Sequence, residues 1–223
     1  EFVKKGMTTI ENNLQRKVDK AKLSTDEKAA VLARIATTTE LMPARDVDLV
    51  IEAIVENKQI KIDLFKELDG ICPPDVIFAS NTSSYPITEL AAATKRQENF
   101  LGTHFFSPVP VMKLVEIIKG LKTSPETAAT VKEFTDNIGK VGIFVKDGPG
   151  FLVNRVNVAL RNEAAALLVE GVATVEDIDT ALKLGLGHPM GPFELGDFAG
   201  LDVQASVNET LFDHFKESKW RAA

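Results

Sequence analysis

The sequence predicts an α/β protein in which a mostly parallel sheet, covered by helices, is followed by an all-helical C-terminal part. Two observations predict this architecture. Short apolar runs alternate with amphipathic segments of helical length as far as Asp147, which is typical of strands joined by crossover helices. After the turn at 147–150, the segments up to Trp220 have helical periodicity. We therefore expect two domains, residues 1–148 and residues 149–223.

The chain is expected to begin with helices. Apolar side chains recur at helical spacing over roughly the first 22 residues, at Val3, Ile10, Leu14 and Val18. A second helix should begin after Ser24, because the residues 24–27 have the form of a capping box. The nearly continuous apolar run 48–54 then predicts a strand that is buried on both faces.

The remaining elements follow in a regular order. Further strands are predicted at 76–79, 100–106, 114–118 and 141–145. Helices are predicted at 60–71 and 87–93, and a third should begin at Ser124-Pro125, which is a helix start signal. In the C-terminal part, a long helix is expected over 151–170, and the capping sequence 174–177 should begin the next one.

Composition excludes several classes of protein. The 26 basic and 32 acidic residues give a net charge of −6, and no basic stripe indicates a nucleic-acid partner. No apolar run is long enough to span a membrane. Cys72 is the only cysteine, so an internal disulfide is impossible and a reducing compartment, the cytoplasm, is expected. The three histidines are far apart in sequence, and we expect no metal site.

Polar residues are concentrated where predicted strands end, and ligands of open α/β sheets bind outside the carboxyl ends of the strands. These residues are Glu56, the segment Asn81–Ser84 and His104. Glu116 follows in an apolar run, where a carboxylate is costly to bury unless it is paired. If the two strands are neighbours, Glu116 can contact His104 and fix its tautomer.

Each of these residues also has a structural interpretation. His104 could be a hydrogen-bonded core histidine, and Glu116 could lie on the solvent side of an edge strand. The segment 81–84 could be a turn whose side chains bind their own backbone. His188 is better explained as a helix-end or interdomain residue and His214 as a solvent-facing one, whereas the lone polar Asn154 in an apolar helix start suggests a polar role.

Four segments together resemble the 3-hydroxyacyl-CoA dehydrogenase family. They are Ser-Asn-Thr-Ser-Ser at 80–84, His-Phe-Phe-Ser-Pro-Val-Pro-Val-Met-Lys-Leu-Val-Glu at 104–116, Gly-Pro-Gly-Phe-Leu-Val-Asn-Arg at 148–155 and His-Pro-Met-Gly-Pro-Phe-Glu-Leu at 188–195. The resemblance extends over residues 1–221 and is strongest to the bacterial 3-hydroxybutyryl-CoA type. It implies a Rossmann-type NAD-binding domain, incomplete at its N-terminus, and a helical domain that binds substrate and forms a homodimer.

The resemblance also implies an activity, the oxidation of 3-hydroxyacyl-CoA with NAD, NADP not being excluded, in fatty-acid or butanoate metabolism. It gives roles to individual residues. His104 matches the general base and Glu116 its orienting carboxylate, while Ser83 and Asn154 match groups that hold the substrate. Cofactor contacts are implied for Glu56, Lys61, Asn81, Ser83 and Ser107, and contacts to CoA for Asn13 and Lys20.

The sequence departs from the family pattern at three places. Ser107 stands where the family usually has Asn. The glycine-rich turn that begins such a fold and the acidic residue that reads the ribose are absent, so we expect these 223 residues alone to bind dinucleotide poorly. A helical segment expected past Trp220 is also absent, which bears on the dimer contacts. Two other functions remain open: an inactive structural relative of the same fold, and an enzyme acting on a free hydroxy acid or sugar acid.

Overall fold

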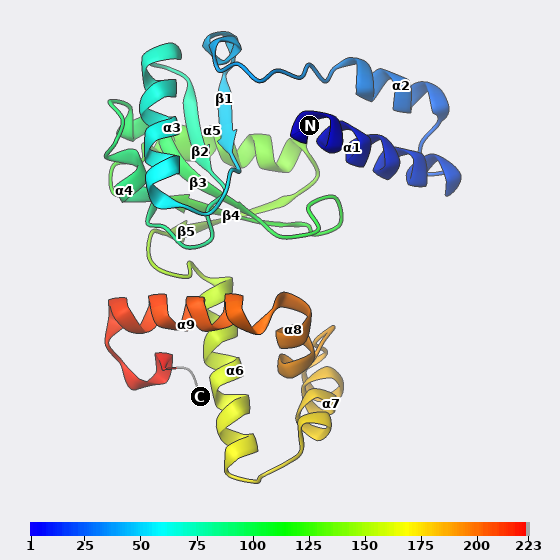
Figure 1. Cartoon of the computed structure of the whole chain (residues 1–223), viewed down its shortest axis with the longest axis vertical. Helices are drawn as coiled ribbons and strands as arrows, with labels where there is room; N and C mark the ends of the chain where they lie inside the picture. Colours follow the sequence, from blue (N-terminus) through cyan, green and yellow to red (C-terminus); the bar gives the residue numbers. More distant parts are fainter. Residues whose placement is uncertain (222–223) are drawn as a thin grey trace. The chain divides into compact units, whose positions relative to one another are not determined.

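A five-stranded sheet organises residues 47–146 of the computed structural model, which describes residues 1–221 (Figure 1). The strands lie side by side in the order of the chain: β1 (Leu49–Glu52), β2 (Ile77–Ser80), β3 (Phe100–Phe105), β4 (Leu114–Lys119) and β5 (Val141–Lys146). All neighbours are parallel except β3 and β4, which are antiparallel. The prediction of a mostly parallel sheet is confirmed.

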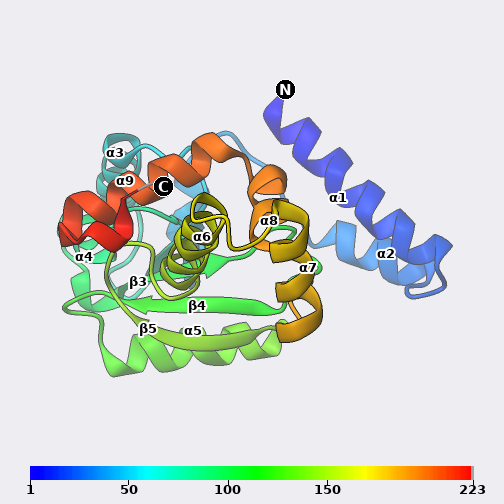
Figure 2. The same cartoon turned by 90° about the horizontal axis from the view of Figure 1, so that it is seen from below.

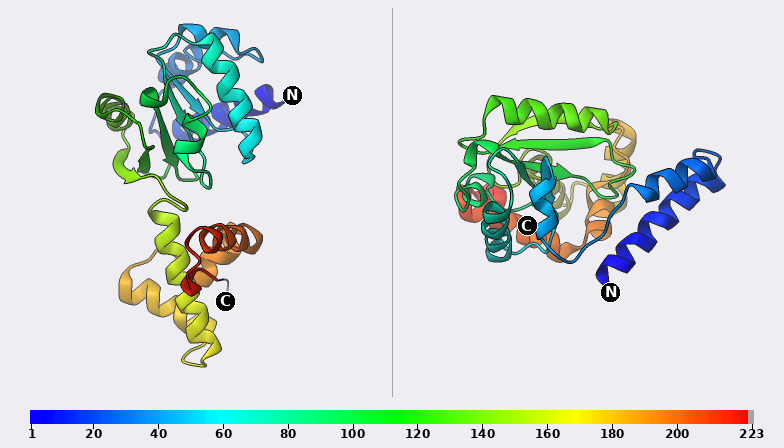
Figure 3. Two further views of the ribbon diagram at one scale, coloured as in Figure 1. Left: turned by 90° about the vertical axis from the view of Figure 1, so that its left-hand side faces the viewer. Right: turned by 90° about the horizontal axis from the view of Figure 1, so that it is seen from above.

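Side chains alternate between the two faces along each strand, so apolar residues lie on both faces of the sheet. Helices cover both of these faces. On one face, Phe65 of α3 (Lys58–Ile71) packs against Phe78 and Phe100, with ring centroids 5.7 Å and 4.7 Å away. The other face carries a buried cluster formed with α5 (Pro125–Asn137), namely Ala79, Leu101, Val115, Ile117 and Val131. Figure 3 shows α3 and α5 on opposite sides of the sheet. The short helix α4 (Ile87–Ala91) packs near α3 and β3.

Residues 1–46 form a separate compact unit, distinct from the unit of residues 47–223. It contains α1 (Phe2–Asp19), α2 (Thr25–Ala33) and a short 3-10 helix, η1 (Met42–Asp46). The capping box is confirmed: the Ser24 hydroxyl accepts from the Glu27 N–H, and the Glu27 carboxylate accepts from the Ser24 N–H. Within this unit no helical side chain is fully buried.

The C-terminal residues form the expected helices, α6 (Val153–Val169), α7 (Val175–Leu186), α8 (Pro192–Ala199) and α9 (Leu201–Phe215) (Figures 1 and 2). A short 3-10 turn, η3 (Ser218–Trp220), follows, and another, η2 (Gln97–Asn99), precedes β3. Val158, Leu211 and Trp220 form the buried centre of the helical part. Among residues 1–221, no helix is both long and apolar enough to cross a membrane.

Two details of the predicted elements are wrong. The strand predicted over 48–54 covers only Leu49–Glu52, and Ile51 is 38% exposed, because β2 is the only strand that β1 contacts within the described residues. The long helix begins at Val153 rather than at residue 151. Phe151 has a positive φ of 47°, which is incompatible with continuing a right-handed helix.

Candidate active site

His104 and Glu116 form a buried pair on β3 and β4, two adjacent inner strands of the sheet. The antiparallel register places the two residues directly opposite each other on β3 and β4, so their side chains lie on the same face. His104 Nδ1 and Glu116 Oε2 are 2.7 Å apart, and the two residues are 5% and 0% exposed. The interpretation of Glu116 as an edge-strand residue is therefore wrong, since β4 lies between β3 and β5.

The second carboxylate oxygen of Glu116 binds the beginning of α6. Oε1 accepts hydrogen bonds from the backbone N–H groups of Leu152 (3.0 Å) and Val153 (2.9 Å). A helix N-terminus presents unpaired N–H donors and favours negative charge. Both oxygens of this buried carboxylate are therefore satisfied, as a buried charge requires.

Ser83 completes a three-residue chain of hydrogen bonds. Its Oγ lies 3.0 Å from His104 Nε2, the ring nitrogen that does not face Glu116. With Nδ1 donating to the carboxylate, Nε2 is the acceptor, and the Ser83 hydroxyl donates to it. The local turn that we considered as an alternative is also present, because Thr82 Oγ1 accepts from the N–H groups of Ser84 and Tyr85.

Glu56 anchors this turn from the loop between β1 and α3. Its Oε1 accepts hydrogen bonds from Thr82 Oγ1 (2.6 Å), the Ser83 N–H (3.0 Å) and the Ser84 N–H (3.0 Å). Burial alone would raise the pKa of the Glu56 carboxyl. Hydrogen bonds from Thr82 and Lys61, the Lys61 charge and the Ser83 N–H outweigh it, so the pKa lies below its usual value.

Lys61 is buried between two carboxylates, which the sequence did not indicate. Its side chain is 1% exposed, and Nζ lies 2.7 Å from Glu52 Oε1 and 3.1 Å from Glu56 Oε2. We missed Glu52 because it ends an apolar strand and has no motif around it. The available signal was an acid at the end of an apolar run followed nine residues later by a lysine on the next helix.

The other predicted site residues have different environments. Asn81 follows β2, and its Oδ1 accepts from the Phe105 N–H at 2.9 Å, which ties the ends of β2 and β3. Asn154 is half-buried in the first turn of α6, directly after Val153. Ser107 is exposed and precedes a cis proline.

Asn13 and Lys20, the residues matched to CoA contacts, lie on and just after α1, within the separate unit of residues 1–46. His188 directly follows the end of α7 at Gly187, as expected for a helix-end residue. His214 is exposed on α9 and borders a cavity that Ser84 also lines.

Comparisons with known proteins identify the family of the chain. The model of the 3-hydroxyacyl-CoA dehydrogenase NAD-binding domain matches residues 1–148, and that of the C-terminal domain matches residues 150–223. A probable 3-hydroxybutyryl-CoA dehydrogenase of Bacillus subtilis is 48% identical over 99% of this chain and 77% of its own length. The 3-hydroxybutyryl-CoA dehydrogenase of Clostridioides difficile is 46% identical, with 99% and 78% covered.

A solved structure gives the same result at the level of the fold. The crystal structure of (S)-3-hydroxybutyryl-CoA dehydrogenase from Ralstonia eutropha superposes with a TM-score of 0.96 at 47% identity, covering 99% of this chain and 78% of that one. The resemblance found in the sequence motifs is thereby confirmed over nearly the whole chain. The chain belongs to the 3-hydroxyacyl-CoA dehydrogenase family.

Proposed function

We propose that this protein is an NAD-dependent dehydrogenase that interconverts (S)-3-hydroxyacyl-CoA and 3-ketoacyl-CoA in fatty-acid or butanoate metabolism. The short-chain pair 3-hydroxybutyryl-CoA and acetoacetyl-CoA is the favoured substrate, in keeping with the names of its relatives. The observation that carries the proposal is the hydrogen-bonded chain Ser83–His104–Glu116 at the end of the sheet where ligands bind.

The proton transfer follows from the environment of the imidazole. Glu116 holds Nδ1, so Nε2 is the atom that removes the proton of the substrate 3-hydroxyl group. The imidazolium that forms lies 2.7 Å from the Glu116 carboxylate, which stabilises its charge. Ser83, whose hydroxyl already reaches Nε2, would hold the substrate oxygen beside the base. In the reverse direction the same imidazolium returns the proton to the ketone oxygen.

The carboxyl ends of β1 and β2 fit the nicotinamide half of NAD. Ile54 and Val55 are exposed apolar residues that offer a surface to a flat ring, and Glu56 follows them with a partly exposed carboxylate. The oxygen of Asn81 is bonded to Phe105, so its amide NH2 group is the donor that can face a ligand. Bound NAD supplies the acceptor for the hydride that leaves C3 of the substrate. The sequence contains no Gly-x-Gly-x-x-Gly turn, and we assign none of its residues to the pyrophosphate.

The remaining contacts are proposed from the family resemblance. Asn154 would bind the thioester carbonyl, supported by its position in the first turn of α6 beside the Val153 N–H that binds Glu116. Asn13 and Lys20 would contact CoA; Lys20 is exposed and can meet an anionic group. Ser107 would contact the nicotinamide side, supported by its exposed position after β3.

We also propose the organisation and location of the protein. The division at residue 148 is supported by the change from alternating strands and helices to helices alone. A homodimer through the helical part is supported by large apolar side chains that are exposed on α6, α7 and α8: Val156, Val169, Leu184 and Phe198. A cytoplasmic location is supported by the single reduced cysteine, Cys72.

The activity can be tested by mixing the full-length protein that the gene encodes with NADH and acetoacetyl-CoA and following the loss of NADH absorbance. Turnover with acetoacetyl-CoA but not with free acetoacetate would support the proposal. Turnover of the free acid alone would favour a hydroxy-acid enzyme, and no turnover with either would favour an inactive relative of the same fold. The His104→Gln variant is the control, since it removes the base without adding charge.

A further inference from the structure

A chain of charged side chains, buried at its inner members Glu52 and Lys61, runs from the end of β1 to the turn that carries Ser83. Glu52, at the end of β1, contacts Lys61 in the first turns of α3, and Lys61 contacts Glu56 in the loop between them. Glu56 then accepts from the backbone N–H groups of Ser83 and Ser84. Because Ser83 Oγ contacts His104 Nε2, only Ser83 lies between the end of this chain and His104.

The innermost member of this chain has little freedom to move. Glu52 Oε1 accepts from Lys61 Nζ and from the Ile54 N–H, both at 2.7 Å, and Oε2 accepts from Ser80 Oγ at 2.6 Å. Glu52 is thus bonded to β2 as well as to α3. The ends of β1 and β2 and the start of α3 are held in one arrangement by a single carboxylate.

Lys61 transmits this arrangement to Glu56. A fully buried ammonium group is costly unless it is paired, and here it is paired with two carboxylates at once. If the Glu52 charge were removed, the Lys61 ammonium would be drawn toward Glu56, its remaining carboxylate partner among the described residues. Glu56 Oε1 would then be displaced from the N–H groups that it holds.

We infer that Glu52 and Lys61 are positioning residues for the dehydrogenase reaction: they fix Glu56, which clamps the Ser83 turn and aims Ser83 Oγ at His104 Nε2. This inference rests on the proposed function of the same site. It extends the site inward to Glu52, a residue that touches neither His104 nor Ser83. The 3.0 Å contact between Ser83 and His104 is the geometry that the chain maintains.

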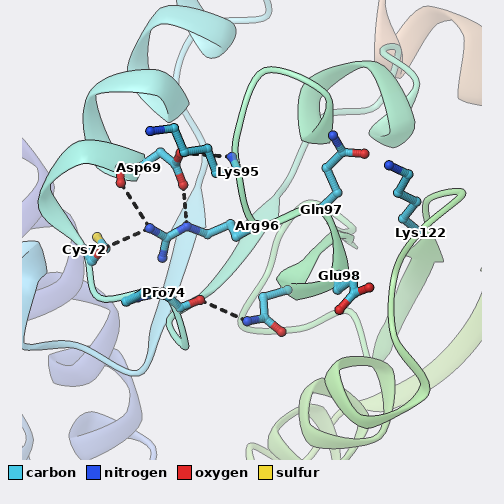
Figure 4. Close-up of a pocket in the computed structure, with 9 residues that line it drawn as sticks. Asp69, Cys72, Pro74, Lys95, Arg96, Gln97, Glu98 and Lys122 are labelled. Atoms are coloured by element: carbon cyan, nitrogen blue, oxygen red, sulfur yellow. Dashed lines mark hydrogen bonds and ion pairs between the residues drawn. The ribbon is translucent and has the colours of Figure 1, made fainter.

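The same helix offers a matched control at its other end. Asp69, in the last turns of α3, forms an ion pair with Arg96, and their side chains are 9% and 5% exposed. Figure 4 shows this pair, with the Arg96 guanidinium also bonded to the carbonyl of Cys72. It is a buried ion pair of similar kind that has no contact with the Ser83 turn. Breaking it should weaken the fold without moving Ser83.

The first experiment compares Glu52→Gln with Asp69→Asn in the intact protein. We expect Glu52→Gln to lower kcat by about 10-fold to 100-fold with a small change in KM, since misplaced reacting groups cost rates of this order. Asp69→Asn should lower the unfolding midpoint and leave kcat near that of the wild type. Equal losses of kcat in both variants would show that the Glu52 pair acts on stability alone and would overturn the inference.

A double-mutant cycle then asks whether Glu52 acts through Ser83. In a Ser83→Ala background, adding Glu52→Gln should cost little further activity, because the group that Glu52 positions is already gone. Additive losses would contradict the inference. If Glu52→Gln does not fold, Lys61→Met carries the same expectations in both experiments.

Hydrogen exchange of the backbone amides, followed by NMR, separates this inference from the proposed function. Amide protons that donate to a carboxylate are held in strong hydrogen bonds, so the Ser83 and Ser84 amides should exchange slowly in the wild type. They should exchange faster in Glu52→Gln and be unchanged in Asp69→Asn. Failure of the wild type to reduce acetoacetyl-CoA would remove the proposed function, whereas unchanged amides in Glu52→Gln would remove only the positioning role.

Discussion

The imidazole of His104 has two nitrogens with different partners, and this difference decides what the residue can do. Nδ1 faces a buried carboxylate that is itself held by two N–H groups, so it cannot serve as the base. Nε2 faces a hydroxyl group, which a substrate alcohol can replace or join. Base catalysis by His104 therefore requires that Nδ1 donates to Glu116 and that Nε2 remains the acceptor.

Replacing His104 by Gln should lower kcat by roughly 10²–10⁴, the usual contribution of a general base. The Michaelis constant for acetoacetyl-CoA should change little, because the loss falls on the transition state. Steady-state kinetics with NADH would measure both constants. A variant with nearly normal turnover would show that His104 is a structural histidine.

The stability that Glu56 contributes to the folded protein should be lost in acid. Because its pKa is lower in the folded state, the stability it contributes is fully present above the usual pKa of 4.5 and is lost as the pH falls through the lower folded value. Glu56→Gln should flatten this acid limb of a plot of unfolding free energy against pH. The exposed Glu67→Gln on α3 is the control, and equal flattening by both variants would contradict the prediction.

Helix ends in this protein are stabilised both by their own sequence and by distant residues. The caps at Ser24, Ser124 and Thr174 could be predicted, because each side chain binds an N–H three residues later. The cap of α8 could not. Its N-cap is Gly191, and Asp179 of α7 supplies the missing acceptor to the N–H groups of residues 193 and 194.

Asp179→Ala should therefore lower the free energy of unfolding by about 0.5–2 kcal/mol, the usual cost of losing a helix cap. Thermal or denaturant unfolding would measure the change. Thr180→Ala, at the exposed next position of the same helix, is the control. A loss no larger than that of the control would show that the cross-helix cap contributes nothing.

The same distinction explains which site residues the sequence revealed. The periodicity of strands and the motif around His104 are local, so the sheet and the base could be predicted. Glu52 is different, because its importance comes from Ser80 and Lys61, which are brought to it only when β1, β2 and α3 assemble. The exposure of Ile51 could not be predicted for a similar reason, since the residues of a strand do not show which other strands pair with it.

Considered as a whole, residues 47–223 leave apolar surface on the helical part that a single copy does not bury. We expect the intact protein to sediment as a dimer at micromolar concentration. Leu184→Asp should weaken the dimer at least about tenfold, since a charge would be buried in an apolar interface. Leu121→Asp, at an equally exposed leucine (83% in both) beside the sheet, should leave it intact. A monomeric wild type, or equal effects of both variants, would count against the proposal.

The two oxygens of Glu116 have a consequence for how such proteins can be recombined. One oxygen is hydrogen-bonded to His104 on β3, and the other accepts from the backbone N–H groups of Leu152 and Val153. The carboxylate that orients the base therefore also connects the sheet to the first helix of the C-terminal part. A chimaera that joined this sheet to the helices of another family member would have to inherit the strand and the junction around residues 147–153 together. Crossovers before β4 or after residue 153 should therefore be tolerated, whereas crossovers between them divide the contact and should be penalised.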